Sequence, residues 1–259
     1  MLSKLFGFRK KDSNDIENEG GADKYGNWSF IGTDMHSHLV PGVDDGAQTI
    51  EDSIQLIQQQ QSMGIRAIIT TPHIKFDHYP NTTATINSGL HTLQQALREQ
   101  NIEMPVKAAA EYYIDDHFMQ LLDTEPLLTI TENQVLVEIS FMFEPARFGD
   151  ILFKIQTKGY KPILAHPERY AYYHGNIEAY RELKERGCYL QLNTIALSGY
   201  YGKGVKMAAE ELLANGLYDY CGSDMHHIRH ADALRKVMQS SIMPALQRYP
   251  FLNSKLELV

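Results

Sequence analysis

Residues 34–46 read DMHSHLVPGVDDG, and this stretch decides how the rest of the chain is interpreted. It begins at the end of a short apolar run, residues 31–35, that is typical of a β-strand. His36 and His38 stand two positions apart on extended backbone, so their imidazoles point to the same side and can reach one metal ion. A His-x-His pair alone is more often structural. Here an aspartate precedes it, and a turn-forming loop with two carboxylates follows it, which favours metal binding.

Outward from this stretch, short apolar runs alternate with longer amphipathic runs. The run over residues 50–63 carries clear helix signals, because Thr49 with Asp52 resembles a capping box and Gly64 follows the last turn. Strands that alternate with helices favour an α/β fold with a parallel sheet. We expect strands over residues 31–35, 67–71, 106–110, 135–139, 162–165, 189–192 and 218–221. We expect helices over residues 50–63, 81–100, 145–159, 177–187, 204–216 and 231–249.

Side chains that can bind metal ions stand near the C-terminal ends of these expected strands. In a barrel of parallel strands these ends converge on one rim, so distant parts of the chain would meet in one pocket. Each side chain alone can equally be read as a solvent-facing residue at a strand end. Five histidines and four carboxylates in this arrangement together indicate a metal cluster. The candidates are His36, His38, Asp45, His73, Glu111, Glu138, His166, Asp224 and His226.

The composition narrows the class of protein. The 259 residues, 43% hydrophobic and 22% charged, are ordinary for a soluble globular chain of one large domain or at most two small ones. A net charge of −8 argues against a nucleic-acid partner, which needs basic surface. Neither Cys188 nor Cys221 is followed six residues later by arginine, so the common signature of cysteine-nucleophile phosphatases is missing. Both lie in apolar stretches and indicate buried thiols, and we therefore expect a cytoplasmic protein.

The first 27 residues are expected to form a basic, flexible tail and linker. Residues 1–11 alternate apolar and basic side chains but lack the long apolar core of a signal peptide or a membrane span. A disordered tail is favoured over its alternative, a weak contact with a membrane surface.

Four motifs resemble one known group of enzymes. DMHSHLVPGVDDGA, TPH at residues 71–73, HPER at 166–169 and SDMH at 223–226 are similar to the polymerase-and-histidinol-phosphatase (PHP) superfamily. They most resemble its branch of bacterial manganese-dependent tyrosine-protein phosphatases of the CpsB/CapC/YwqE type. The resemblance covers roughly residues 30–250 and implies a distorted seven-stranded (β/α)7 TIM-like barrel, to which we assign residues 28–259. It also implies a hydrolase that dephosphorylates a bacterial tyrosine kinase controlling polysaccharide export.

The family pattern also implies a trinuclear metal centre. Imidazole with carboxylate oxygen suits Mn²⁺, Fe²⁺ or Zn²⁺ without choosing among them, and the resemblance points to manganese. Glu138 occupies a place where other branches often have histidine, which favours the tyrosine-phosphatase branch. The implied ligands are His36, His38, Glu111 and Asp224 for the first ion; Glu111, Glu138 and His166 for the second; and Asp45, His73 and His226 for the third.

Charge and leaving group both favour a phosphate monoester as substrate. Three divalent ions and four carboxylates leave two positive charges, which match a phosphomonoester dianion. A hydroxide bridging two metals is expected to attack phosphorus, and a phenolate, with a parent pKa of about 10, needs little protonation on leaving. Arg169 is the first candidate for phosphate contact, with a surface ion pair as its alternative, and Arg229 is the weaker candidate.

Other functions remain open at this point. A small-molecule phosphatase of the histidinol-phosphate type is the first alternative, and a non-catalytic metal-binding regulator is a further one. Phosphodiester cleavage is disfavoured by the acidic balance. His227 and His230 are interpreted as structural, with a role beside the metal ligands or as acids as the alternative. His78 is interpreted as a solvated loop residue that could instead line the substrate entrance.

Overall fold

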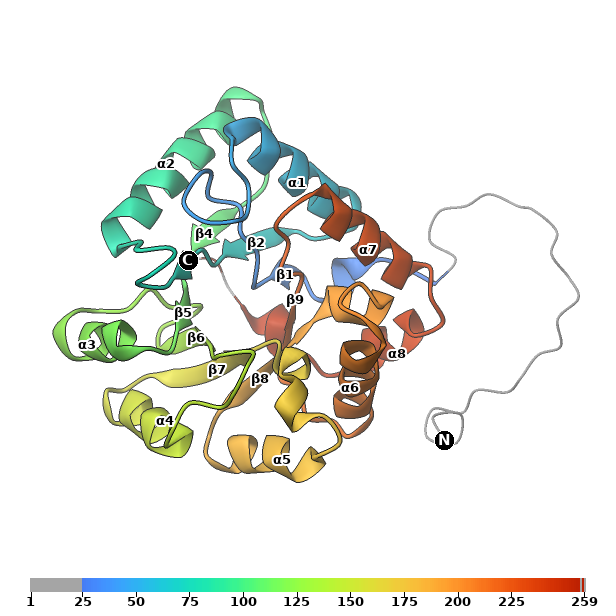
Figure 1. The fold of residues 1–259 in the computed structure, drawn as a ribbon. Helices are drawn as coiled ribbons and strands as arrows, with labels where there is room; N and C mark the ends of the chain where they lie inside the picture. Colours follow the sequence, from blue (N-terminus) through green and yellow to red (C-terminus); the bar gives the residue numbers. More distant parts are fainter. Residues whose placement is uncertain (1–24, 257, 259) are drawn as a thin grey trace, which may run out of the picture.

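The computed structural model describes residues 25–256 and Leu258, so nearly all of the expected tail and linker lies outside the described residues. Within them, nine short β-strands alternate with eight α-helices, and Figure 1 shows the helices as an outer layer around the strands. The strands are β1 Thr33–Asp34, β2 Ala67–Thr70, β3 His73–Ile74, β4 Val106–Ala108, β5 Glu111–Tyr113, β6 Gln134–Glu138, β7 Lys161–Ala165, β8 Tyr189–Asn193 and β9 Tyr220–Gly222. The helices are α1 Ile50–Ser62, α2 Thr83–Glu99, α3 Asp116–Thr124, α4 Phe148–Thr157, α5 Ile177–Glu185, α6 Lys203–Ala214, α7 Ile228–Met238 and α8 Met243–Arg248.

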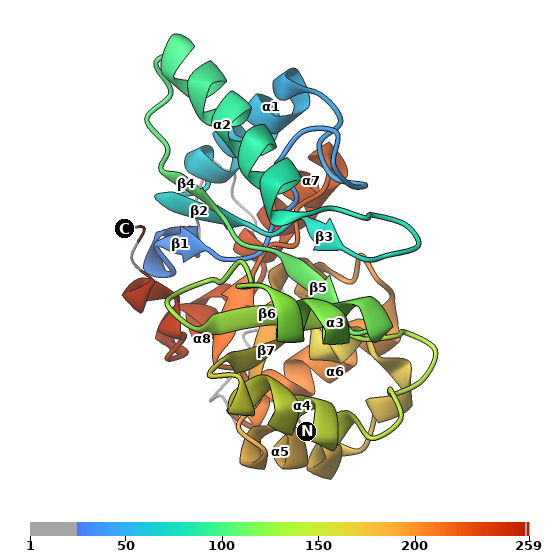
Figure 2. The same ribbon diagram turned by 90° about the vertical axis from the view of Figure 1, so that its left-hand side faces the viewer.

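The strands form two sheets in which every pairing is parallel. One sheet has the order β1-β2-β4 and the other the order β3-β5-β6-β7-β8-β9. Parallel neighbours need long crossover connections, which the helices supply. Figure 2 shows the smaller sheet beside α1 and α2, and the larger sheet beside α3, α4 and α5. The mixed α/β fold with parallel strands is therefore confirmed.

Two of the seven expected strands, over residues 67–71 and 106–110, are each followed by a further short strand that was not expected, which gives nine. The run over residues 67–71 stops at Thr70, and the chain pairs again at His73 as β3. Pro72 lies in between and has no backbone N–H, so it cannot donate to a neighbouring strand. The neighbouring strand is interrupted at the same level, between Ala108 and Glu111. Register is kept, because both interruptions are two residues long.

The segments that follow β1 and β9 lie side by side. Ser37 and Met225 form a parallel bridge, His38 N donates to Met225 O at 2.9 Å, and Asp224 N donates to His36 O at 2.7 Å. These contacts bring the first candidate ligands in the sequence, His36 and His38, next to the last ones, Asp224 and His226.

The helices agree with expectation in part. The capping box of Thr49 and Asp52 is confirmed at the start of α1. The sequence analysis missed α3, which is only nine residues long and is capped by Asp115. The single helix expected over residues 231–249 is wrong: α7 begins at Ile228, and α8 begins separately, with Pro244 in its first turn. Proline is tolerated in a first turn but interrupts a helix interior.

The core lies between the strands and the helix layer. Val135, Leu136 and Val137 of β6 and Ile163 and Leu164 of β7 are fully buried. Consecutive buried apolar residues are typical of parallel strands that are covered on both faces. None of the described helices is long and apolar enough to cross a membrane.

Candidate metal centre

All nine side chains predicted as metal ligands lie close together. They form four overlapping groups in which the nitrogen and carboxylate oxygen atoms lie within 4.8 Å of one another. Because several residues belong to more than one group, the assignment of each residue to one of three ions stays a prediction. The groups are His38, Asp45, His73 and His226; His36, His38 and Asp224; His36, Glu111 and His166; and His73, Glu111 and Glu138.

The parallel strands bring these residues to one end of the sheets. His73 and Glu111 begin the short strands β3 and β5, and Glu138 is the last residue of β6. The first two were expected to follow strands, but pairing resumes at these two residues after the breaks at 71–72 and 109–110. The remaining positions follow strands as expected: His36 and His38 after β1, Asp45 in the loop before α1, His166 after β7, and Asp224 and His226 after β9.

Glu111 stands at the centre of the cluster. Its Oε2 atom lies 3.1 Å from His73 Nδ1, 3.3 Å from His36 Nε2 and 3.4 Å from His38 Nε2. This oxygen and His73 Nδ1 are both buried, yet neither has a hydrogen-bond partner. Atoms that share one ion at about 2.0–2.3 Å lie roughly 3–3.5 Å apart. The spacing therefore fits divalent ions held between these atoms.

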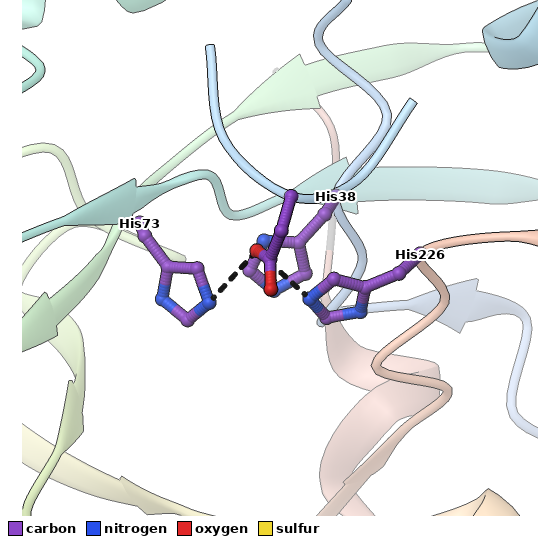
Figure 3. Close-up of side chains that lie close together, drawn as sticks. His38, His73 and His226 are labelled. Atoms are coloured by element: carbon purple, nitrogen blue, oxygen red, sulfur yellow. Dashed lines mark ion pairs between the residues drawn. The ribbon is translucent and has the colours of Figure 1, made fainter. Parts of the chain in front are cut away.

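A second part of the cluster opens toward solvent. Asp45 Oδ1 lies 3.6 Å from His73 Nε2 and 3.5 Å from His226 Nε2, and the Asp45 side chain is 55% exposed. The rings of His38 and His226 stack with their centroids 3.9 Å apart. Figure 3 shows the imidazoles of His38, His73 and His226 close together although they come from three separate segments. This group has one accessible side from which an ion and a substrate can approach.

The buried charges of the cluster are unbalanced without a cation. Burial and the charge of Glu111 raise the pKa of Glu138 well above its usual value. Burial works against ionisation of Glu111 as well, but His36 and His73 outweigh it and hold the pKa of Glu111 well below the usual range. Burial lowers the pKa of His36, but Glu111 and Asp224 raise it overall to about 9. Divalent cations would reverse this competition, because they stabilise ionised carboxylates and neutral imidazoles.

Two of the ligand positions have unusual backbone conformations. His166 has φ 36° and Asp224 has φ 51°, both in the left-handed region that residues other than glycine rarely adopt. Such strained positions persist where the surrounding structure enforces them, and they concentrate at functional sites. Each turns the chain just after a strand and directs a metal-binding side chain into the cluster.

Two groups that hold the imidazoles in place were missed by the sequence analysis. Asp44 Oδ2 lies 2.7 Å from His38 Nδ1 and also accepts a hydrogen bond from the backbone N–H of His73. Gln191 Oε1 lies 2.8 Å from His36 Nδ1. In both histidines the partner at Nδ1 leaves Nε2 free to face the cluster, as is usual for metal-binding imidazoles. Asp44 was visible in the loop motif, whereas no local signal identified Gln191.

Two further buried carboxylates, Asp34 and Glu168, hold segments next to the cluster in place. Asp34 accepts hydrogen bonds from the backbone N–H and the hydroxyl of Ser223, which joins the ends of β1 and β9. Glu168 accepts from Asn193 N and from the Tyr218 hydroxyl, and burial raises its pKa to about 7. Glu168 therefore belongs to the interior, and it forms no described ion pair with its neighbour Arg169.

Arg169 lies between two aromatic rings at the edge of the cluster. Its guanidinium carbon is 4.6 Å from the centre of the Phe141 ring and 4.5 Å from that of Tyr201. Its Nη1 donates to Asp224 Oδ2 at 3.0 Å, and the side chain is 24% exposed. A guanidinium has five N–H donors, so this single bond leaves donors for an anion. The alternative for Arg169 was an ion pair on the surface. The structure shows an ion pair with the buried Asp224, which is itself a candidate metal ligand.

Six of the nine ligand candidates line one cavity of about 340 Å³ together with Arg169, and this size suits a small organic group. They are Asp45, His73, Glu138, His166, Asp224 and His226. Lys75, His78, Tyr79, Phe141 and Tyr201 contribute to the same walls. Arg229 is exposed on α7 and is not among the described residues that line the cavity, so its contact with phosphate stays a prediction.

His227 and His230 also line the cavity, as His78 does. The rings of His227 and His230 lie 4.0 Å apart, and burial lowers the pKa of His230 to about 3. A neutral ring is consistent with a structural role and with a role beside the metal ligands. The roles of His78, His227 and His230 stay predictions.

The chain is similar to known proteins over most of its length. A family model described as capsular polysaccharide synthesis, CpsB/CapC, matches residues 32–241. Tyrosine-protein phosphatase YwqE of Bacillus subtilis (strain 168) is 31% identical over 197 residues, which span 76% of this chain and 78% of that protein. Tyrosine-protein phosphatase CpsB of Streptococcus pneumoniae is 28% identical over 201 residues, which span 75% and 83%.

The solved structures that resemble this one include the following two. The first comes from crystal structures of YwqE from Bacillus subtilis and CpsB from Streptococcus pneumoniae, described as unique metal-dependent tyrosine phosphatases. Its TM-score is 0.75 at 27% identity, and the match covers 88% of this chain and 96% of that one. The second is the lactonase Lmo2620 from Listeria monocytogenes, with a TM-score of 0.51 at 13% identity, which shows a shared fold alone.

Proposed function

Because this chain belongs to the CpsB/CapC family of capsular polysaccharide synthesis, we propose that it is a metal-dependent hydrolase that removes phosphate from phosphotyrosine on a protein. The relatives YwqE and CpsB carry the name tyrosine-protein phosphatase and match along most of their length. The observation that carries the proposal is the cluster of nine candidate metal-binding side chains, six of which line one cavity together with Arg169. Cations and a guanidinium around one small cavity suit a dianionic phosphate.

The proposal includes three divalent ions, with Mn²⁺ as the expected metal and Fe²⁺ or Zn²⁺ as alternatives. The overlapping groups around Glu111, His38 and His73 support more than one ion, because each of these residues borders two sets of ligand atoms. Mixed imidazole and carboxylate ligands suit all three metals. When bound, such ions activate water as a nucleophile and neutralise charge on phosphate oxygens.

The protein side chains then have distinct tasks. Asp44 and Gln191 fix the direction of His38 and His36, so that the ligand atoms are in place before a substrate arrives. Arg169 is held by Asp224 and by two aromatic rings, and its remaining donors bind phosphate oxygens. A phenolate leaves without a strong acid, since its parent phenol has a pKa of about 10.

We also propose that the two sheets act together as a distorted barrel of seven broken strands. The bridge between Ser37 and Met225 supports this, because it joins the segments after β1 and β9. The breaks between β2 and β3 and between β4 and β5 lie at the same level. This supports counting each pair as one broken strand, which gives seven strands rather than nine. Such an arrangement would explain why all the ligands reach one end.

The proposed partner is a tyrosine kinase of the capsular polysaccharide system, phosphorylated on its own tyrosines. The family description supports a place in capsule synthesis, and the acidic chain argues against nucleic acid as a partner. A cytoplasmic location belongs to the same proposal and agrees with two cysteines that are free thiols.

Hydrolysis of p-nitrophenyl phosphate, with and without added Mn²⁺ and a chelator, is the first test. We expect turnover that requires the metal. A panel of phosphotyrosine peptides, phosphoserine peptides and histidinol phosphate under one metal condition then identifies the substrate class. We expect phosphotyrosine peptides to be preferred. A preference for histidinol phosphate would replace this proposal with a small-molecule phosphatase, and absence of turnover with every divalent ion would leave a metal-binding regulator.

A further inference from the structure

Phe141 is an apolar ring in an otherwise polar cavity. It lies three residues after Glu138, in the loop between β6 and α4, and it lines the cavity with 41% of its surface exposed. Among the described residues that line the cavity, it is the one whose side chain carries no polar atom. Exposing a large apolar ring to water has a cost, which contact with an apolar part of a ligand would remove.

The ring is held in position from its packed side. It stacks on His166 with centroids 5.7 Å apart and on Tyr170 with centroids 5.5 Å apart, at interplanar angles of 27° and 30°. Arg169 also contacts it, through a guanidinium carbon 4.6 Å from the ring centre.

The loop backbone around this ring is fixed as well. The backbone N–H of Ile139 donates to the Tyr170 hydroxyl, and the Tyr172 hydroxyl donates to Ser140 O. The exposed part of the Phe141 ring is therefore presented to the cavity by a preorganised contact surface, which lowers the entropy lost on binding.

Its neighbours determine what the ring can meet. Phe141 contacts both the candidate phosphate-binding arginine and a candidate metal ligand, His166. A phosphate held by Arg169 and the ions would bring its ester group beside this ring. In a phosphotyrosine that group is an aromatic ring, whereas a phosphoserine has only a methylene there. Aromatic rings gain from offset or edge-on contact with one another beyond the area that they bury.

We infer that Phe141 determines specificity for aryl phosphates, by packing against the aromatic ring that the phosphate carries. The inference rests on the proposed function, since it concerns the substrate of the same cavity. It goes further in naming the side chain that distinguishes an aryl from an alkyl ester. Phe143 offers a matched comparison: it lies in the same loop, is 67% exposed, and is not among the described lining residues.

Equilibrium binding of two non-hydrolysable ligands, phenylphosphonate and methylphosphonate, to the Mn²⁺-loaded full chain tests the inference by calorimetry. In Phe141→Ala we expect phenylphosphonate to bind about tenfold more weakly, which corresponds to about 1.4 kcal/mol, with methylphosphonate changed less than twofold. Phe143→Ala should leave both affinities unchanged. Phe141→Tyr should restore most of the preference, because it keeps the ring.

A parallel measurement of kcat/KM for p-nitrophenyl phosphate should follow the phenylphosphonate affinity. Metal content and the melting temperature of each variant show whether the site and the fold are intact, and Phe141→Leu is the substitute if the alanine variant does not fold. Equal weakening of both ligands would overturn the inference and assign Phe141 to holding Arg169. Equal affinity of the two ligands in the wild type would also overturn it. Failure of the proposed function is recognised separately, as wild-type protein without metal-dependent turnover.

Discussion

Two glycines give the imidazoles of the cluster the space that they occupy. A Cβ atom on Gly46 would collide with the backbone and Cβ of His38, and one on Gly222 would lie 2.6 Å from the Cβ of His36. In both places the neighbouring atom is backbone or Cβ, which cannot move aside without moving the ligand. Glycine at position 46 therefore allows the loop backbone to approach His38 closely. In the DDG end of the loop, the glycine matters as much as the two carboxylates.

Gly46→Ala should consequently displace His38. We expect a loss of stability of about 1–3 kcal/mol, as for other overpacked sites, and at least a tenfold loss of activity. Metal content of the purified protein and its thermal unfolding measure the two effects. Gly204→Ala in α6 is the control, because a Cβ there meets only the His174 side chain at ordinary contact distances and alanine is the better helix former. Unchanged metal content in Gly46→Ala would contradict the steric argument.

Arg169→Ala separates phosphate binding from metal binding. Removing the guanidinium should reduce kcat/KM for p-nitrophenyl phosphate by about 10²-fold, while metal content stays near that of the wild type. Arg98→Ala, an exposed arginine on α2, is the control for loss of charge. Arg229→Ala should have a smaller effect than Arg169→Ala, since Arg229 lies outside the described cavity wall. Full activity of Arg169→Ala would remove it from the site.

Among the elements, α1 begins with a complete capping box. Thr49 Oγ1 accepts from Asp52 N, and the Asp52 carboxylate accepts from Thr49 N. Thr49→Ala should therefore cost about 1 kcal/mol in the free energy of unfolding, measured by urea denaturation. The same change at Thr82, which caps α2 through Thr85, is the matched comparison and should cost a similar amount. A loss below a few tenths of a kcal/mol at both positions would show that neither cap matters.

The elements also show how far local sequence signals reach. The convergence of the candidate ligands could be predicted, because parallel strands bring their C-terminal ends together whatever the details of pairing. The break at Pro72 could be predicted from the sequence, because proline has no backbone N–H. The matching break in the neighbouring strand could not be predicted, because it depends on the register between the two strands. The partnership of Gln191 with His36 joins residues far apart in sequence, so only the folded chain shows it.

For the whole molecule, the charge imbalance of the cluster links stability to metal. Ions that bind the folded state alone stabilise it by about 2.7 kcal/mol at a hundredfold excess over Kd. We expect Mn²⁺ to raise the melting temperature of the chelator-treated protein by roughly 5–10 °C. Glu138→Gln keeps the volume but removes a carboxylate, so its shift should be smaller. An identical melting temperature with Mn²⁺ and with chelator would contradict a folded-state metal site.

Both thiols report on the integrity of the interior. Burial raises the pKa of Cys188 to about 12 and that of Cys221 well above its usual value, so both are protonated at pH 8. Ionisation alone then makes Cys188 about a thousandfold less reactive than a free thiol at that pH. Native protein should resist a thiol reagent, and two thiols should react after unfolding. Rapid labelling of the native chain would show that this part of the structure opens readily.

The contact between Ser37 and Met225 has a consequence for how the protein is made in the cell. Ligands from the beginning of the chain, such as His36, complete their surroundings only when Asp224 and His226 arrive. The ribosome adds about 5–20 residues per second, and nearly the full length of the chain must be synthesised before the site can form. We therefore expect metal to bind late at the proposed centre, and a chain that terminates before Asp224 would lack two of its candidate ligands.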